Sequence, residues 1–180
     1  VWRVGTGTGF RGGERVCVIP MVTCGACANC RAGDGRNCLA RQGIGLTVDG
    51  GFAAEVRVPA ACCVALPDAV DAELGALVEP LGVGAEAVLT GAVGLGDTVL
   101  VMGPGTIGQA IALFARRAGA ARVIISGRAD VPRFDVCRAL GFDELLDVAE
   151  APLAEGVLAA TGGRPVDVVL EATGVPATLN

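Results

Sequence analysis

The 180-residue sequence contains no histidine and no tyrosine, one tryptophan and five phenylalanines. Without histidine, the chain cannot supply an imidazole ligand to a metal ion. Aromatic residues make up 3% of the chain, the net charge is −5, and no run of basic residues occurs. These deficits argue against a surface that stacks bases or neutralises phosphates, and against an electrostatic membrane anchor. We therefore expect neither a nucleic-acid partner nor a membrane partner.

Long hydrophobic segments are also missing. The longest uncharged window, residues 98–115, has the length of a membrane span, but Gly103, Pro104, Gly105 and Gly108 lie within it. A strand, a tight turn and a helix account for it better. The first ten residues lack the features of a secretory signal, and we predict a cytoplasmic protein. Neither an initiator methionine nor a natural C-terminal end is evident, so we expect this chain to be part of a longer protein.

The residues that are present indicate a folded chain whose character changes near residue 80. Apolar residues make up 52% of the chain, which is typical of a globular protein. Short alternating runs at 15–19 and 52–58, separated by glycine and proline, indicate antiparallel strands. Asp71 is placed to cap a helix that Pro80 would interrupt. The predicted domains are residues 1–80 and 81–180.

Four of the eight cysteines crowd into fifteen positions, namely Cys24, Cys27, Cys30 and Cys38. Four thiolates at this spacing can surround one zinc ion, and an all-cysteine shell leaves no position open for a substrate. We therefore predict a structural zinc lobe over residues 24–38, ordered only when metal is bound. Cys17, Cys62, Cys63 and Cys137 lie in apolar stretches and are interpreted as small buried hydrophobic residues.

Other uses of these four cysteines are two disulfides, free thiols or an iron–sulfur cluster. A bacterial ferredoxin motif places its fourth cysteine three residues after the third, with proline next. Here seven residues intervene and Leu39 follows. The spacing therefore favours zinc over a cluster.

The second informative segment is an apolar run from Thr98 that ends in the GxGxxG pattern of Gly103, Gly105 and Gly108. A helical pattern with an apolar stripe follows over residues 109–118. In a dinucleotide-binding fold these glycines permit a turn, let the backbone approach the pyrophosphate, and pack helix on strand. The alternative is that the glycines serve packing alone.

The context supports the nucleotide-binding interpretation. Strands are predicted at 123–126 and 166–170, with a helix between them at 133–140. Alternating strands and helices indicate a parallel, doubly wound sheet. At the tip of the second strand Arg128 stands where an acid would favour NAD, and Asp130 comes late. Charge alone slightly favours NADP, but a solvated loop arginine fits equally well, so the choice of NAD or NADP stays open.

The order of motifs resembles one family, the zinc-dependent medium-chain dehydrogenase/reductases of the alcohol, sorbitol and threonine dehydrogenase type. The matching segments are 13–16, 24–38, 50–53, 58–60, 79–81, 103–108 and 171–174. The resemblance implies an α/β protein. It would consist of a partial GroES-like β-barrel domain with a structural zinc lobe, followed by a truncated Rossmann domain with a doubly wound parallel sheet.

The resemblance also implies a function. The intact protein would transfer a hydride between a secondary alcohol or polyol and NAD or NADP, using a structural and a catalytic zinc, as a homodimer or homotetramer. Glu79 would be the carboxylate at the catalytic zinc. The cofactor would contact Gly103, Gly105, Thr106, Ile107, Gly108, Arg128, Thr173 and Gly174.

The rest of the family's catalytic site is not found in this sequence. The family's catalytic cysteine and its His–Glu pair would lie before Val1, so we expect this chain to be inactive alone. The alternative function is a non-catalytic, zinc-stabilised nucleotide-binding module.

Overall fold

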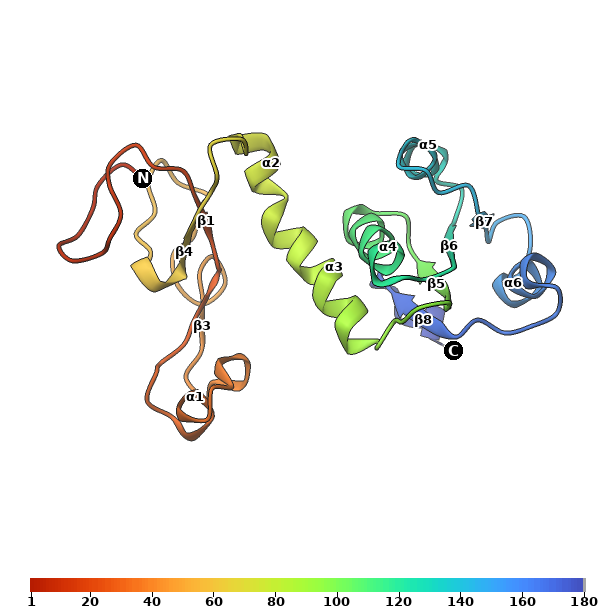
Figure 1. The fold of residues 1–180 in the computed structure, drawn as a ribbon, viewed down its shortest axis with the longest axis horizontal. Coiled ribbons are helices and arrows are strands. Elements are labelled where there is room, and N and C mark those ends of the chain that lie inside the picture. The colour runs from red at the N-terminus through yellow and green to blue at the C-terminus, as the bar shows by residue number, and fades with distance from the viewer. Residues whose placement is uncertain (180) are drawn as a thin grey trace. The chain divides into compact units, whose positions relative to one another are not determined.

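A computed structural model describes residues 1–179. The chain divides into two compact units, Val1–Glu79 and Pro80–Asn180, and each is described by itself. Figure 1 shows the helices and strands of both units and labels them where there is room. Among the described residues, no helix has the length and apolar character needed to cross a membrane.

The first unit contains two short antiparallel strand pairs. β1 (Val16–Val18) pairs with β4 (Cys63–Ala65), and β2 (Met21–Val22) pairs with β3 (Gln42–Gly43). The prediction of antiparallel strands here is confirmed. The strand expected at 52–58 was wrong, because this segment has no ladder partner among the described residues and most of its side chains are exposed. The unit also has a short helix and two 3-10 turns, α1 (Ala28–Arg31), η1 (Gly35–Asn37) and η2 (Ala60–Cys62).

Two helices follow the strands. α2 (Ala72–Ala76) begins after Asp71, whose side chain accepts a 2.8 Å hydrogen bond from the backbone N–H of Leu74. This cap is the predicted one. The prediction that Pro80 interrupts the helical segment was wrong. Pro80 lies in the first turn of α3 (Val78–Thr90), where a missing backbone N–H costs no helical hydrogen bond.

The second unit is built on a four-stranded parallel sheet in the order β7-β6-β5-β8. Its strands are β5 (Thr98–Met102), β6 (Arg122–Gly127), β7 (Leu145–Asp147) and β8 (Val168–Glu171). The chain passes from β5 through β6 to β7, and then returns to the other side of β5 to form β8. The parallel sheet was predicted, but β7 and the helix after it were not.

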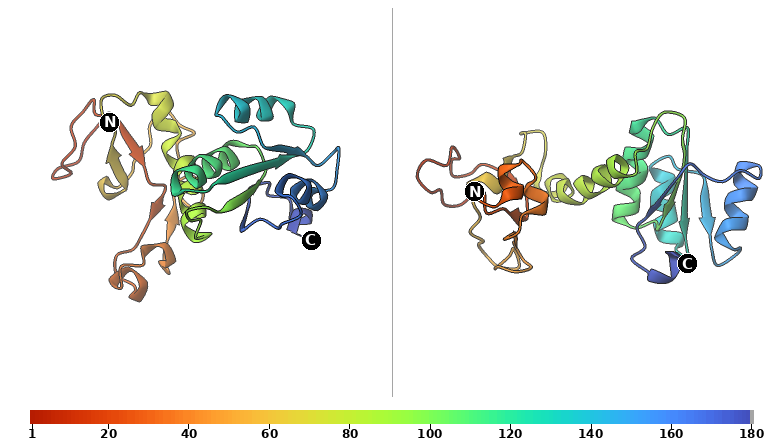
Figure 2. Two further views of the ribbon diagram at one scale, coloured as in Figure 1. Left: turned by 45° about the vertical axis from the view of Figure 1, so that its right-hand side comes forward. Right: turned by 90° about the horizontal axis from the view of Figure 1, so that it is seen from below.

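Helices cover both faces of this sheet, as Figure 2 shows. They are α4 (Thr106–Ala118), α5 (Val131–Ala139) and α6 (Leu153–Thr161), and a 3-10 turn, η3 (Pro176–Leu179), ends the described chain. Val99 and Val101 of β5 pack with residues of α4 and α5, including the fully buried Cys137. Leu100 and Met102 point to the other face and pack with Val157 of α6. The alternation of side chains along a strand therefore builds two cores.

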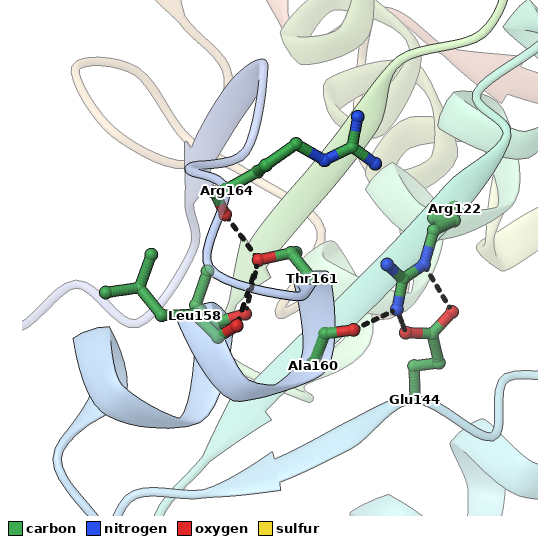
Figure 3. Close-up of polar contacts among 7 residues, drawn as sticks. Arg122, Glu144, Leu158, Ala160, Thr161 and Arg164 are labelled. Atoms are coloured by element: carbon green, nitrogen blue, oxygen red, sulfur yellow. Dashed lines mark hydrogen bonds and ion pairs between the residues drawn. The ribbon is translucent and has the colours of Figure 1, made fainter.

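Polar contacts connect the end of α6 to the start of β6. The Arg122 guanidinium at the start of β6 pairs with the Glu144 carboxylate and donates a 2.9 Å hydrogen bond to the carbonyl oxygen of Ala160 (Figure 3). The Thr161 hydroxyl lies 2.9 Å from the carbonyl oxygen of Val157 and also contacts that of Arg164. The bond to Ala160 satisfies a carbonyl group in the last turn of α6 that the helix itself leaves without a partner.

Candidate metal and dinucleotide sites

The four clustered cysteines meet in space. Two come from the turn before α1, one from α1 and one from the end of η1, and their sulfur atoms all lie within 4.8 Å of one another. Gly25 and Gly33 have φ angles of +69° and +81°, which a glycine adopts without strain, and so permit the sharp turns of the lobe. Cys38 is buried and Cys24 is exposed. Sequence spacing alone predicted this cluster.

Backbone N–H groups point at the sulfur atoms. The N–H of Cys24 donates to Cys38 Sγ at 3.3 Å, that of Cys27 to Cys24 Sγ at 3.4 Å, and that of Cys30 to Cys27 Sγ at 3.5 Å. The N–H groups of Cys30 and Leu39 lower the pKa of Cys27 to about 6. Partial burial and neighbouring sulfurs raise the pKa of Cys30 to about 12. The thiolate form is therefore favoured at Cys27 and disfavoured at Cys30.

The arrangement fits a zinc ion. A tetrahedral zinc with Zn–S bonds of about 2.3 Å separates its sulfur ligands by about 3.8 Å. The Cys24 and Cys30 sulfur atoms are 4.0 Å apart, so a small inward adjustment would complete such a shell. Asn37, which precedes the last ligand, donates to Asp34 at 2.8 Å, and Asn29 donates to the carbonyl oxygen of Asn37 at 2.5 Å. These bonds brace the turn that presents Cys38.

The glycine turn lies between β5 and α4. Gly103 has a φ of +108°, and a Cβ atom there would lie 2.9 Å from the carbonyl oxygen of Ala172. A Cβ on Gly108 would lie 1.8 Å from the carbonyl oxygen of Gly103. A Cβ on Gly105 would meet no described atom within 4 Å. Two glycines therefore allow close packing within the protein, while the third borders open space.

That open space faces the beginning of α4. The helix starts at Thr106, follows Gly105 as its N-cap, and has no side-chain cap and no acidic residue in its first turn. The N–H groups of Thr106, Ile107 and Gly108 precede the first possible helical hydrogen bond, so they remain available to an anion. The side chain of Gln109 donates to the carbonyl oxygen of Pro104 at 2.8 Å and holds the turn against the helix.

Beyond β6, the chain presents Arg128 as an exposed residue. Asp130 is engaged elsewhere, because its carboxylate caps α5 at the N–H of Arg133 and pairs with the Arg133 guanidinium at 2.5 Å. Asp147 at the end of β7 accepts hydrogen bonds from the N–H of Ala129 at 2.9 and 3.1 Å. Hydrogen bonds from Ala129 and Ala149 lower the pKa of Asp147, and the positive charge of Arg128 adds to this effect. The end of β6 is therefore followed by the exposed guanidinium of Arg128, while the carboxylate of Asp130 is already engaged by Arg133.

Thr173 and Gly174 lie in the loop after β8, where both are exposed. Glu171, the last residue of β8, accepts hydrogen bonds from the N–H groups of Thr173 at 2.5 Å and Gly174 at 3.2 Å, and from the Thr173 hydroxyl. The Thr173 hydroxyl and these N–H groups lower the pKa of Glu171. Glu171 belongs to the segment 171–174 that carries the family resemblance, but it was not predicted as a site residue. An acid at a strand end followed two residues later by threonine was the available signal.

Glu79 is exposed in the first turn of α3. In the described part of the chain, three or more metal-binding side chains come together at one place, the four cysteines. Glu79 is not among them. The residues present therefore do not assemble a catalytic zinc site around Glu79.

Two family models match the chain. Residues 1–68 match the alcohol dehydrogenase GroES-like domain, and residues 106–180 match the zinc-binding dehydrogenase model. The L-threonine 3-dehydrogenase of Rhizobium etli (strain CIAT 652) is 36% identical over 167 residues, covering 93% of this chain and 48% of that protein. The chain belongs to the zinc-dependent medium-chain dehydrogenase/reductase family. The resemblance and the fold class expected from the sequence are thereby confirmed.

Further proteins resemble this chain along most of its length. The scyllo-inosose 3-dehydrogenase of Thermotoga maritima is 36% identical over 93% of this chain and 44% of that protein. A zinc-binding dehydrogenase from Sinorhizobium meliloti 1021, solved with NADP, has a TM-score of 0.87 at 33% identity and covers 96% of this chain and 51% of that one. A protein from Escherichia coli CFT073 described as a short chain alcohol dehydrogenase, solved with NADH, has a TM-score of 0.87 at 32% identity, covering 98% of this chain and 52% of that one. The chain thus spans about half the length of the relatives that it matches.

Proposed function

We propose that the protein is a zinc-dependent oxidoreductase that transfers a hydride between a secondary alcohol or polyol and a nicotinamide cofactor. The observation that carries this proposal is the turn between β5 and α4. There, two glycines pack against backbone while Gly105 borders open space before an uncapped helix N-terminus. This is the geometry that a dinucleotide pyrophosphate requires, because the phosphates must approach the backbone closely.

The chain's own residues have distinct proposed roles. The N–H groups of Thr106, Ile107 and Gly108 bind the pyrophosphate, and the left-handed conformation of Gly103 directs the chain into the helix. Arg128 neutralises a phosphate on the adenosine ribose, and Thr173 with Gly174 lines the opposite half of the cofactor site. When bound, the nicotinamide supplies the hydride chemistry, and the protein supplies orientation and exclusion of water.

The four cysteines are proposed as ligands of a structural zinc. Four sulfur ligands complete a tetrahedral shell, so this ion would stabilise the lobe and would not contact the substrate. Glu79 stays a proposed carboxylate of the catalytic site. The chain contains no histidine, and the described residues do not complete that site. No reaction step is therefore assigned to Glu79.

Substrates are proposed from the relatives. The two enzymes named above act on L-threonine and scyllo-inosose, so a secondary alcohol beside a second polar group is the first class to test. The experiment uses the complete protein, because the chain alone is expected to be inactive, and follows the absorbance of the reduced nicotinamide with L-threonine, inositols, other polyols and simple alcohols, each with NAD and with NADP. Cofactor reduction that requires both the alcohol and zinc supports the proposal. Tight cofactor binding without turnover of any alcohol would contradict it.

A second candidate function is a non-catalytic, zinc-stabilised nucleotide-binding module. One observation favours it: the described residues bring four cysteines together and place a glycine turn before a helix N-terminus, but they form no second group of three or more metal-binding side chains. The same assay separates the two functions, because a module binds the cofactor and zinc without reducing the cofactor. A homodimer or homotetramer and a cytoplasmic location stay predictions, which light scattering and cell fractionation would test.

A further inference from the structure

The Glu171 carboxylate accepts several hydrogen bonds from the loop that follows β8. One carboxylate oxygen accepts the N–H groups of Thr173 and Gly174 and the hydroxyl of Thr173. That hydroxyl in turn accepts the N–H of Val175 at 3.0 Å, and the Thr178 hydroxyl lies 3.5 Å from the carboxylate oxygen. A single side chain therefore fixes the backbone of a loop that is otherwise exposed. Hydrogen bonds to a charged acceptor are the stronger kind.

The loop begins beside the glycine turn. Glu171 pairs with Met102 in the sheet, and the N–H of Ala172 donates to the carbonyl oxygen of Met102 at 2.8 Å. The carbonyl oxygen of Ala172 would lie 2.9 Å from a Cβ on Gly103. The loop that Glu171 holds therefore borders the turn proposed to approach the pyrophosphate.

The sheet order places this loop at a topological switch point. β6 and β7 lie on one side of β5, and β8 lies on the other. Ligands of doubly wound sheets bind in the crevice at such a point, with one half of a dinucleotide over each set of strands. An adenosine half placed over β6, where Arg128 lies, would leave the nicotinamide half on the side of β8 and its following loop.

We propose that Glu171 is a positioning residue for the nicotinamide half of the cofactor, an inference that rests on the proposed function. Its carboxylate holds residues 172–175 in the conformation that receives the nicotinamide nucleoside. Without it, the loop must be ordered at the moment of binding, which lowers affinity for the ligand half that contacts the loop. The adenosine half does not reach the loop and keeps its affinity.

The test compares complete and truncated cofactors on the purified protein by titration calorimetry. The complete ligands are NAD and NADP, and the truncated ones are ADP and its 2′-phosphate, which lack the whole nicotinamide nucleoside. Glu171→Ala is expected to weaken binding of the complete cofactors about tenfold, the effect of one or two lost hydrogen bonds, and to leave the truncated ligands within about twofold. Glu171→Gln keeps an acceptor oxygen in the same place and is expected to recover most of the affinity.

Glu144→Ala serves as the matched control, because Glu144 is another partly exposed carboxylate of the same unit that pairs with Arg122 away from the loop. It is expected to leave the ratio of complete to truncated affinities unchanged. Equal weakening of both ligand types by Glu171→Ala, or no weakening, would overturn the assignment of Glu171 while the proposed function stands. Failure of the unsubstituted protein to bind any of the four ligands would overturn the proposed function and this inference with it.

Discussion

Gly108 packs directly on the backbone of Gly103, since a Cβ added to Gly108 would lie 1.8 Å from the Gly103 carbonyl oxygen. A contact this short cannot be relieved by a side-chain rotation, because the opposing atom is backbone. The pair therefore ties the first turn of α4 to the end of β5, which keeps the helix N-terminus at the edge of the sheet. Gly105, between them in sequence, carries no such packing constraint.

This difference predicts two kinds of glycine variant. Gly108→Ala should lower the free energy of unfolding by about 3 kcal/mol or more, because the turn must open to admit the methyl group. Gly105→Val should leave the melting temperature close to that of the unsubstituted protein and weaken cofactor binding about a hundredfold, because its side chain fills the approach to the pyrophosphate. Thermal melts and cofactor titrations measure both effects. Unchanged cofactor affinity in Gly105→Val would contradict the assigned turn.

The zinc lobe should depend on its metal. Purified protein is expected to contain about one zinc ion per chain, and Cys38→Ser should lose it and open the lobe, because the site is a large part of the lobe's folding free energy. Cys63→Ser is the control, since Cys63 lies in β4 and is not part of the cluster. Metal analysis and limited proteolysis of residues 24–38 provide the readout. Retention of zinc by Cys38→Ser, or a brown iron–sulfur chromophore, would disprove the assignment.

Arg128 should influence the choice of cofactor. Arg128→Ala is expected to reduce the ratio of NADP to NAD affinity about tenfold, because a guanidinium stabilises the 2′-phosphate and Asp130 is already engaged by Arg133. Arg138→Ala removes the same charge from α5, where Arg138 pairs with Asp135, and controls for net charge. Titration with both cofactors measures the ratio. An unchanged ratio would show that Arg128 is a solvated loop residue.

Asp147 should make the second unit sensitive to acid. Its pKa is lowered in the folded state, so its contribution to stability is present above the pKa of the unfolded state and is lost as pH falls through the lower, folded value. Asp147→Asn should therefore melt earlier than the unsubstituted protein at pH 7, with the gap closing toward pH 3. Asp135→Asn, an exposed acid on α5, should show a much smaller gap. Melting curves across this range decide the matter, and a gap independent of pH would contradict the role given to the carboxylate.

The sequence revealed local features well, because spacing along a chain constrains short turns. The cysteine lobe, the glycine turn, the cap at Asp71 and three of the strands, β5, β6 and β8, all follow from residues close together in sequence. The effect of Pro80 was predicted wrongly because a proline is tolerated in the first turn of a helix but interrupts a helix interior. Which of the two applies depends on where the helix starts, and α3 starts at Val78. Residues 52–58 alternate like a strand, but a strand forms only beside a partner.

By itself, the sequence determined which side chains could bind zinc and where a backbone could approach a phosphate, because both depend on residue type at fixed spacing. Tertiary structure alone decided which residues from distant parts of the sequence come into contact. It placed the carbonyl group of Ala172 against Gly103 and the carboxylate of Asp147 at the N–H of Ala129. The physical reason is that sheet order brings β8 beside β5 from 66 residues away in sequence, from Met102 to Val168, and no local pattern encodes that pairing.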